Sequence, residues 1–435
     1  MRHRRTALVA LVGLLLAGTL ALTWHRIEQR SCGAGVTSVA DPVDPLMSAA
    51  LMRKRPDEHR DTLAAAVARM GPPFGEVLAG VDYYYEQWLH LYGAPGEDGG
   101  GVLAWTKRNA PVTMLAADTL EPVWALRPDS RRVAWDVSAD SFLLLRLSAD
   151  RPTEVIEHDL ATGERRWCAR LETSNRDGDP ITTTFLADDS VVIAAQDGSG
   201  RTSLVRLSTD GDEQWQRSSR AVDRADFVGA LGDLVVVGGR EEFHLADGRY
   251  PTPEGADITA FSARTGKPVW QHSTDGGSVH VVGVSDRLVV LLERRADGVR
   301  LAALDEKGHE AWSVALPPSA LQATLRSGTV VVKSQEAITA HAASDGHRLW
   351  KFRIPATFTP YGFTLAMMPS LDADHLLLPT TRDLRVLDLR TGRQRRLPMP
   401  TDGINTTYWP YQLLATDRLV GVVTNTGAIV ARRTP

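Results

Sequence analysis

The sequence predicts an all-β fold built from repeated four-stranded units, and three observations support this prediction. A short phrase in which a glycine is followed four residues later by a tryptophan occurs five times. With 36 Gly and 11 Trp in 435 residues, chance would give about one such pair, so the count indicates an internal repeat. Short apolar runs alternate with Gly, Asp and Asn turns, and the tryptophans recur every 38 to 55 residues, which suits four short strands. The five pairs are Gly163 and Trp167, Gly211 and Trp215, Gly266 and Trp270, Gly308 and Trp312, and Gly346 and Trp350.

Each part of the phrase has a direct physical interpretation. In copies such as Asp159–Trp167 and Ala263–Trp270, the glycine suits the positive φ of a tight hairpin turn. The Asp or Thr beside it can form a hydrogen bond with the turn backbone. The tryptophan begins the next strand, where its flat ring offers a surface to the adjoining sheet and its indole N–H needs one partner. We therefore expect each phrase to form a hairpin between two strands.

The strands of each unit are expected to be buried on both faces. Runs such as Val235–Val237 and Leu288–Leu291 are apolar at every position, as strands between two other layers should be. A single unit cannot bury both of its faces, so it needs a neighbour on either side. Four antiparallel strands repeated at this spacing fit the blades of a β-propeller.

Degenerate copies extend the repeat toward both ends of the chain. Asp118–Trp124 keeps the tryptophan and lacks the glycine, whereas Asp388–Gly392 keeps the turn and has Arg396 where the tryptophan would be. The chain ends after one more apolar run and turn, so a strand from its beginning should complete the last blade. Tyr83–Trp88 is the expected closing strand. We predict eight blades, with seven as the alternative.

The repeat resembles a known type. Ile258–Trp270, an apolar strand followed by Thr-Gly and then Trp, looks like the PQQ-like repeat, and the resemblance covers roughly residues 100–432. This repeat occurs in pyrroloquinoline-quinone dehydrogenases and in many propellers that bind no quinone, so it implies the blade type and not an activity. The resemblance also reaches cell-envelope propellers that assist outer-membrane protein assembly, which use surface loops and carry no cofactor.

The beginning of the chain predicts a membrane anchor. Ala7–Trp24 contains no charge and would span about 27 Å as a helix, enough to cross a bilayer core. Three arginines precede it, which favours a cytoplasmic N-terminus and export of everything that follows. The poor cleavage site at Thr19–Ala21 favours an uncleaved signal-anchor, with a cleaved signal peptide as the alternative. We therefore expect a single-pass bacterial cell-membrane protein with its propeller outside the cytoplasm.

These assignments divide the chain into three regions. Residues 1–25 form the cytoplasmic tail and transmembrane anchor, residues 26–92 a partly helical spacer, and residues 93–435 the propeller. Pro45–Met70 is rich in Ala, Leu, Met and Arg, which indicates one or two short helices that pack on the rim of the propeller. A partner-binding helix is the alternative for this segment.

The sequence contains two cysteines, Cys32 and Cys168, and both would lie outside the cytoplasm, where disulfides persist. A bond between them would join the spacer to the second blade beside Trp167. Two unpaired thiols are the alternative, because the sequence does not give the distance between the two residues. No spacing of Cys and His predicts a metal site.

Composition and motifs argue against several classes of function. The net charge is −4, so there is no electrostatic basis for binding nucleic acid. The sequence lacks a Gly-x-Ser-x-Gly, Walker or His-Glu-x-x-His motif, and it has no match for the adjacent cysteines, catalytic Asp and Ca²⁺ ligands of the quinone dehydrogenases. The conspicuous acids Asp159, Asp305 and Asp388 all fall in the repeat turn, where a structural role explains them. We expect no catalytic residue, no metal and no cofactor.

Three histidines and two segments remain to be assigned. His309, His341 and His347 lie beside turns and are expected at the solvent-exposed surface. Arg240–Asp257, the longest departure from the repeat, is a candidate ligand or partner loop, with an insertion without function as the alternative. The aromatic cluster Tyr408–Tyr411 is a candidate surface patch, with a packed blade strand as the alternative.

Together these observations predict a non-catalytic, membrane-anchored, extracytoplasmic propeller that binds a protein partner as an interaction or scaffold module of the cell envelope. The alternative is a small-molecule sensor or a quinone-dependent oxidoreductase that uses the propeller channel. An enzyme should gather ionisable residues from several blades at one channel mouth, whereas a scaffold should present an exposed apolar or aromatic patch on its rim or side.

Overall fold

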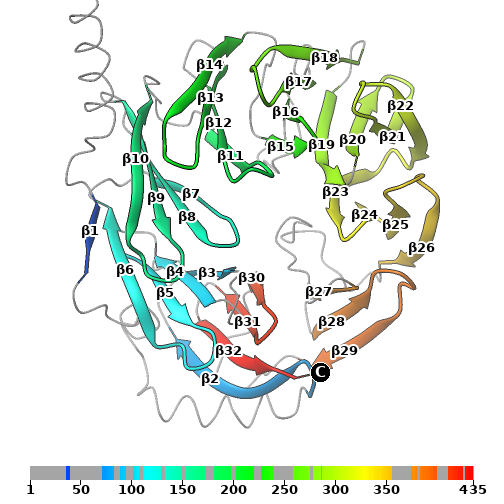
Figure 1. Ribbon diagram of the computed structural model, residues 1–435. Helices are drawn as coiled ribbons and strands as arrows, with labels where there is room; N and C mark the ends of the chain where they lie inside the picture. The colour runs from blue at the N-terminus through cyan, green and yellow to red at the C-terminus, as the bar shows by residue number, and fades with distance from the viewer. Residues whose placement is uncertain are drawn as a thin grey trace, which may run out of the picture.

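The computed structural model shows sheets arranged as blades around a central axis (Figure 1). The structure describes residues 36–39, 71–82, 89–94, 101–106, 111–128, 133–147, 152–171, 181–196, 202–219, 227–238, 258–274, 278–285, 287–354, 374–379, 383–398, 410–424 and 427–434. These residues form eight antiparallel sheets and no helix. The predicted all-β, eight-bladed propeller is therefore confirmed.

Within each blade the strands follow one another outward from the axis (Figure 1). The last strand forms the outer edge except in blades 1 and 8, where a strand from the beginning of the chain lies outside it. Blade 1 contains β3 (Leu89–Ala94), β4 (Gly101–Thr106), β5 (Val112–Ala116) and β6 (Pro122–Pro128), with β1 (Val36–Ser38) outside β6, and blade 2 contains β7 (Val133–Val137), β8 (Ser141–Arg146), β9 (Thr153–Asp159) and β10 (Arg165–Leu171). Blade 3 contains β11 (Ile181–Phe185), β12 (Val191–Gln196), β13 (Thr202–Leu207) and β14 (Glu213–Ser219). Blade 4 contains β15 (Phe227–Leu231), β16 (Leu234–Gly238), β17 (Ile258–Ser262) and β18 (Pro268–His272).

Blades 5 to 8 continue the same order. Blade 5 contains β19 (Ser278–Ser285), β20 (Leu288–Arg295), β21 (Gly298–Leu304) and β22 (Glu310–Leu316), and blade 6 contains β23 (Ala320–Arg326), β24 (Thr329–Ser334), β25 (Ala337–Ala342) and β26 (Arg348–Arg353). Blade 7 contains β27 (His375–Pro379), β28 (Asp383–Asp388) and β29 (Gln394–Pro398). Blade 8 contains β30 (Pro410–Ala415), β31 (Leu419–Thr424) and β32 (Gly427–Arg433), with β2 (Phe74–Asp82) outside β32.

A β-bulge follows the repeat turn in six blades. The register of the third and fourth strands skips one residue beside the tryptophan, for example between Arg165 and Trp167 in blade 2. Equivalent shifts occur in blades 1, 3, 4, 5 and 6. Because a bulge increases the local twist and changes the direction of the side chain beside it, it helps to aim the tryptophan at the next blade.

The core consists of apolar clusters between adjacent blades. Val235, Val236 and Val237 on β16 are each 0% exposed. Val235 and Val237 pack in one cluster with Trp215 of blade 3, whereas Val236 packs in another cluster with Leu291 of blade 5. Since successive side chains of a strand point to opposite faces, the continuous apolar run reflects one blade on each side.

The two ends of the chain meet in blade 8. β2 pairs antiparallel with β32, from Phe74 opposite Arg433 to Asp82 opposite Gly427. A strand from the beginning of the chain completes the last blade, as expected, but this strand is β2 and not Tyr83–Trp88, which lies outside the described residues. Without β2, the N–H and C=O groups along one edge of β32 would be unpaired.

The sheets begin before residue 93, where we placed the start of the propeller. β1, β2 and most of β3 fall within residues 26–92, and the described part of this range forms strands. The expected helices of Pro45–Met70 and the expected anchor, residues 1–25, lie outside the described residues. Among the residues that the structure does describe, no helix is long and apolar enough to span a bilayer.

We expect the pairing of β2 with β32 to be essential for stability. A chain that starts at residue 83 lacks β2 and leaves the β32 edge unpaired, so it should aggregate or lose its cooperative thermal transition. A chain that starts at residue 71 keeps β2 and is the control, because both chains lack β1. Circular dichroism and size-exclusion chromatography would compare them, and equal unfolding temperatures would contradict this expectation.

Candidate functional site

The aspartate of the repeat turn holds the turn together. In blade 2 the Asp159 carboxylate accepts hydrogen bonds from the Thr162 backbone N–H at 2.9 Å and from the Thr162 hydroxyl at 3.0 Å. The Gly163 N–H donates to the Asp159 carbonyl oxygen at 2.8 Å, and Gly163 has a φ of +72°. Asp305 and Asp388 likewise accept two backbone N–H groups each in their own turns. All three acids therefore have a structural role.

Each repeat tryptophan packs on the turn glycine of the following blade. A Cβ atom on Gly163 would lie 2.7 Å from Trp124 Cγ, and one on Gly346 would lie 2.5 Å from Trp312 Cε3. No side chain fits at such distances, so only glycine leaves room for the ring. We call this arrangement the Trp–Gly contact. The other four contacts are Trp167 with Gly211, Trp215 with Gly266, Trp270 with Gly308, and Trp350 with Gly392.

A hydrogen bond from the indole nitrogen accompanies the Trp–Gly contact. Trp124 Nε1 donates to the Leu160 carbonyl oxygen at 2.9 Å, within the repeat turn of blade 2. The Leu160 N–H donates in turn to the Asp140 carbonyl oxygen at 2.9 Å, in the turn between the first two strands of that blade. Leu160 thus joins the preceding blade to both turns on this face of the propeller, which we call the turn face.

The same combination of bonds recurs in other blades. Ala263 and Ala343 each accept an indole N–H from the preceding blade and donate their own N–H to the first turn of their blade. Leu389 likewise accepts the indole N–H of Trp350, and its own N–H donates to the carbonyl oxygen of Asp374, directly before β27. In blade 5, Trp270 Nε1 donates to the Glu306 carbonyl oxygen at 3.0 Å. Trp167 differs, because its Nε1 has no hydrogen-bond partner among the described residues.

Neither interface of blade 8 has a Trp–Gly contact among the described residues, and the closure of the ring explains why. The third and fourth strands of blade 8 are β32 and β2, which come from opposite ends of the chain, so no turn joins them and Arg396 stands in blade 7 where a tryptophan would be. At the other interface β2 contains no tryptophan, and Leu120 occupies the glycine position of blade 1 with a φ of 60°. Leu120 is 4% exposed and packs in an apolar cluster with Leu414 and Ala428 of blade 8.

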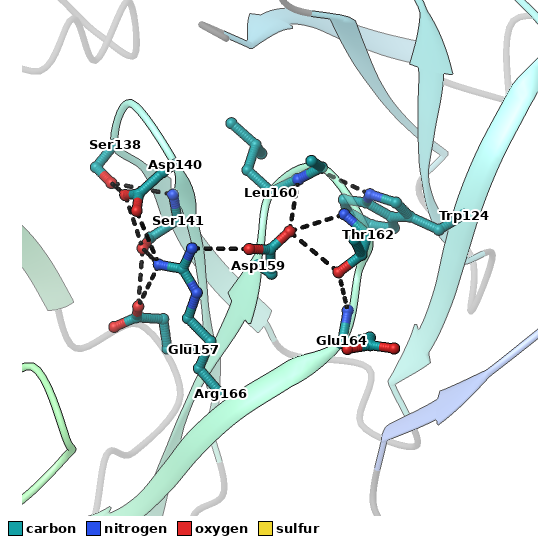
Figure 2. A network of polar contacts seen from close by, with 11 residues as sticks. Trp124, Ser138, Asp140, Ser141, Glu157, Asp159, Leu160, Thr162, Glu164 and Arg166 are labelled. Carbon is teal, nitrogen blue, oxygen red and sulfur yellow. Dashed lines mark hydrogen bonds and ion pairs between the residues drawn. The ribbon is translucent and has the colours of Figure 1, made fainter. Parts of the chain in front are cut away.

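Arg166 joins the two turns of blade 2 (Figure 2). Its Nη1 donates to Asp140 Oδ2 at 3.1 Å, to Ser141 Oγ at 2.7 Å and to Glu157 Oε1 at 3.3 Å. Its Nη2 donates to Asp159 Oδ2 at 2.8 Å, and the Ser141 hydroxyl donates to Glu157 Oε1 at 2.8 Å. One guanidinium therefore contacts three carboxylates and one hydroxyl.

In this network the charged side chains of blade 2 pair with one another. The Glu157 side chain is 7% exposed, and the more open Asp140 side chain is 67% exposed. Hydrogen bonds from Arg166 and from the Thr162 N–H hold the pKa of Asp159 below its ordinary value. Asp159 is consequently ionised and engaged at neutral pH, which does not suit a general acid or base. The network fixes the turn face and offers no reactive group.

A second network joins blades 4 and 5. The Glu293 side chain is 0% exposed and accepts hydrogen bonds from Arg300 Nε at 2.6 Å and Arg295 Nε at 2.9 Å. His272 Nε2, on the outer strand of blade 4, lies 2.8 Å from Glu293 Oε1. Burial by itself would raise the pKa of Glu293, but hydrogen bonds with His272 and Arg300 outweigh it and lower the pKa to about 2. Glu293 is therefore an ionised group that connects two blades.

The inner strands carry few ionisable side chains. The Asp, Glu, His, Lys and Arg residues of β3, β7, β11, β15, β19, β23 and β30 are His90, Asp136, His280 and Arg326. Asp136 accepts hydrogen bonds from the Thr183 hydroxyl of blade 3 at 2.6 Å and from the Val137 N–H at 2.9 Å, and burial raises its pKa. In the part of the chain that the structure describes, no three His, Cys, Asp or Glu side chains are placed to hold a metal ion. These residues do not fit the Ca²⁺ and quinone site of the dehydrogenases that share the repeat.

His341, which we expected at the surface, is buried. It is 3% exposed, and its Nδ1 lies 3.0 Å from the carbonyl oxygen of the turn glycine. His158 makes the same contact in blade 2 at 2.9 Å. Burial lowers the pKa of both histidines, so both are neutral at neutral pH. His309 and His347 are exposed, as expected.

The remaining sequence candidates are only partly covered by the structure. Cys168 lies on β10 and takes part in a disulfide bond. Its expected partner, Cys32, lies outside the described residues, so this pairing stays a prediction. The candidate loop Arg240–Asp257 and the side chains of Tyr408–Tyr411 also lie outside them.

The described surface does not present the apolar or aromatic patch that we expected of a scaffold. Its exposed large apolar side chains are Val123 and Val269, at 51% and 53%. Each lies directly before a tryptophan on an outer strand, in blades 1 and 4 respectively. Two isolated valines on separate blades do not form a continuous docking surface.

Comparison with known proteins supports the repeat type and the fold. Residues 254–430 match the family model for outer membrane protein assembly factor BamB. The predicted PQQ-like repeat is thereby confirmed over this range. No curated protein sequence matches the chain significantly.

Solved structures extend the likeness to most of the chain. Sqt1 from Saccharomyces cerevisiae is 11% identical with a TM-score of 0.52, over 81% of this chain and 97% of that chain. The computationally designed protein Ika8 is 12% identical with a TM-score of 0.51, over 79% of this chain and 100% of that chain. BamB from Moraxella catarrhalis is 17% identical with a TM-score of 0.47, over 82% of this chain and 99% of that chain. The likeness to Sqt1 and Ika8 shows the propeller fold alone.

The Trp–Gly contact can be tested with two glycines of blade 6 that share a φ of +73°. A Cβ on Gly328 would meet nothing within 4 Å, whereas one on Gly346 would collide with Trp312. Gly328→Ala should lower the free energy of unfolding by about 1 kcal/mol through its backbone alone. Gly346→Ala should lower it by about 3 kcal/mol, because overpacking is added. Urea denaturation would measure both, and equal losses would show that the contact contributes nothing.

The buried Glu293 predicts a specific acid sensitivity. Its folded-state pKa of about 2 lies below the ordinary value of 4.5, so its stabilising contribution is complete above pH 4.5 and is lost as the pH falls toward 2. Glu293→Gln should lower the thermal unfolding temperature at pH 7 and should flatten its decline below pH 4.5.

The control for this experiment is Glu310→Gln. The Glu310 carboxylate is 40% exposed and contacts Arg300 at 3.0 Å, so its removal should leave the pH profile close to that of the wild type. If the Glu293→Gln profile ran parallel to that of the wild type, Glu293 would not be the group that titrates.

Proposed function

We propose that this chain is a non-catalytic propeller, anchored in the cell membrane through residues 7–24 and displayed outside the cytoplasm, where it binds a protein partner as an interaction or scaffold module of the cell envelope. The observation that carries the proposal is how the described ionisable residues are used. Those of the turn face and of the blade interfaces are bonded to one another, as around Arg166 and Glu293. The inner strands, which would line a catalytic channel, contribute only four such residues in their described parts.

The repeat type supports a protein partner. The family model that matches residues 254–430 is described as an outer membrane protein assembly factor, which names an assembly role in the cell envelope. The anchor expected here is a membrane-spanning helix, so the proposal covers the class of partner and the compartment, and not that particular assembly role.

The position of Arg240–Asp257 in the fold makes this segment the first candidate for the partner-binding loop. β16 ends at Gly238 and β17 begins at Ile258, so the segment connects the second and third strands of blade 4. Because adjacent strands are antiparallel, this connection starts and ends on the face opposite the turn face. Sequence changes there leave the Trp–Gly contacts intact.

A small-molecule sensor or a quinone-dependent oxidoreductase is the second candidate, and Asp136 is the observation that favours it. This carboxyl group lies on an inner strand, and burial raises its pKa. Such a group can change its protonation state when a ligand binds beside it. Asp136→Asn should abolish ligand binding of this kind and leave capture of a protein partner unchanged.

The proposal predicts that a discrete partner can be cross-linked to the full-length protein in its native membrane. Replacement of residues 240–257 by a short Gly-Ser linker should abolish this capture, and deletion of residues 45–70 would test the spacer in the same way. The control replaces residues 197–201, which connect β12 and β13 on the same face of blade 3, with Gly and Ser.

Mass spectrometry of the cross-linked products would identify the partner. A partner that is lost with the 240–257 replacement and retained in the control supports the scaffold function and locates its surface. Capture of nothing above background would overturn the scaffold function. Titration of the purified protein with a quinone and Ca²⁺ would then test the second candidate.

A further inference from the structure

The outer strands of blades 6 and 7 carry seven exposed cationic side chains, and we call this surface the basic rim. Figure 1 shows β26 and β29 as the outermost strands of neighbouring sheets. The residues of the basic rim are Arg348, Lys351 and Arg353 on β26, and Arg390, Arg393, Arg395 and Arg396 on the turn and strand of blade 7.

The number of cations distinguishes the basic rim from the rest of the repeat. Residues 390–396 contain four Arg and no Asp or Glu, whereas the equivalent residues of blade 3, 209–215, contain three acids and no Lys or Arg. The equivalent segments of blades 2, 5 and 6 contain both signs, and that of blade 4 contains one Arg and one Lys. The basic rim is positively charged although the whole chain has a net charge of −4.

Four of these seven cations have no side-chain partner within the described residues. Arg390 pairs with Asp374 at 3.4 Å, and Arg395 donates to the Pro72 carbonyl oxygen. Arg396 also takes part in an interaction. Within the described ranges, the side chains of Arg348, Lys351, Arg353 and Arg393 form no hydrogen bond or ion pair. The nearest acids in the sequence, Asp345 and Asp388, accept hydrogen bonds within their own turns.

The Trp–Gly contact between blades 6 and 7 brings the two parts of the basic rim beside each other. Lys351 directly follows Trp350, and Arg393 directly follows Gly392. A Cβ on Gly392 would lie 2.8 Å from the Trp350 ring, so the two segments are in contact across the interface. The segments that carry the cations of β26 and of blade 7 are therefore neighbours at the outer edge of this interface.

Protection of the sheet edge does not explain the basic rim. Charged side chains on an outer strand discourage pairing with another chain, but either sign achieves this, and the equivalent segment of blade 3 carries three acids instead. A cluster of one sign is self-repulsive, and an anionic partner removes that repulsion.

We propose that the basic rim binds a carboxylate-rich, extended segment of a partner protein. Six of the seven cations are Arg, whose planar guanidinium can bind a carboxylate through two parallel hydrogen bonds. Blade 1 shows that an outer strand of this propeller accepts a further strand, because β1 pairs with β6 from Val36 opposite Pro128 to Ser38 opposite Leu126. β29 is likewise the outermost strand of its sheet. The inference rests on the proposed function, to which it adds a surface and the chemistry of the partner.

Binding of a fluorescein-labelled oligoglutamate peptide to the full-length protein in neutral detergent tests this inference. Fluorescence anisotropy would compare the wild type with the double variant Lys351→Glu/Arg393→Glu. The control is Arg264→Glu/Lys267→Glu, because both of its residues are exposed on the blade 4 turn and the change of net charge is the same. The rim variant should bind about tenfold more weakly than the wild type, the control should bind like the wild type, and added salt should weaken the binding.

Equal affinities of the rim variant and the control would overturn the inference, provided that circular dichroism shows both to be folded. Sedimentation with phosphatidylglycerol vesicles that depends on the rim and that oligoglutamate does not compete for would overturn it in favour of a lipid surface. In the native-membrane cross-linking experiment, loss of the captured partner in the rim variant alone would support the inference that the basic rim binds that partner. A partner captured equally by all variants would exclude the basic rim and leave the proposed function standing. Rim-dependent peptide binding without any captured partner would exclude the proposed function and leave the acidic ligand standing.

Discussion

The Trp–Gly contact between successive blades is the constraint on which the rest of this propeller depends. It places a large ring against a glycine that has no room for a Cβ atom. At the contacts of Trp124, Trp215 and Trp312, the residue whose carbonyl oxygen accepts the indole N–H also donates its own N–H to the first turn of the next blade. One contact therefore sets the distance between blades and the conformation of the turn. The turn aspartate, the left-handed glycine and the bulge beside the tryptophan are local conditions for the same contact.

The closure of the ring shows what happens where the contact cannot form. Blade 8 takes its last two strands from opposite ends of the chain, so it has no repeat turn to receive a tryptophan. At the interface of blades 7 and 8, Arg396 of β29 stands in place of the tryptophan. At the interface of blades 8 and 1, Leu120 stands in place of the turn glycine. The Leu120 side chain packs against blade 8 in the apolar cluster at that interface, so apolar packing replaces a specific ring contact.

The blade type and the number of blades could be predicted because the turn glycine and the tryptophan recur in copy after copy and leave a period in the sequence. The closing strand was harder, since an outer strand such as β2 need not be apolar on both faces, and the tryptophan of Tyr83–Trp88 pointed to the wrong segment. The networks around Arg166 and Glu293 gave no sequence signal, because their members meet only through strand register. His341 was misassigned for a related reason: it occupies the strand position of Leu304 in blade 5, which is buried whatever residue stands there.

The same constraint limits where a function can reside. The second and third strands are buried between neighbouring blades, and the turn face is occupied by tryptophan rings, turn aspartates and the bonds between them. Substitution at these positions disturbs a blade interface, so they have little freedom to acquire a binding role. The exposed positions of the outer strands, such as Val123, Lys351 and Arg396, are free of this requirement because their side chains lie outside the blade interfaces. A charge pattern on an outer strand that departs from all other copies, as on blade 7, is therefore more informative about a partner than a departure within the core would be.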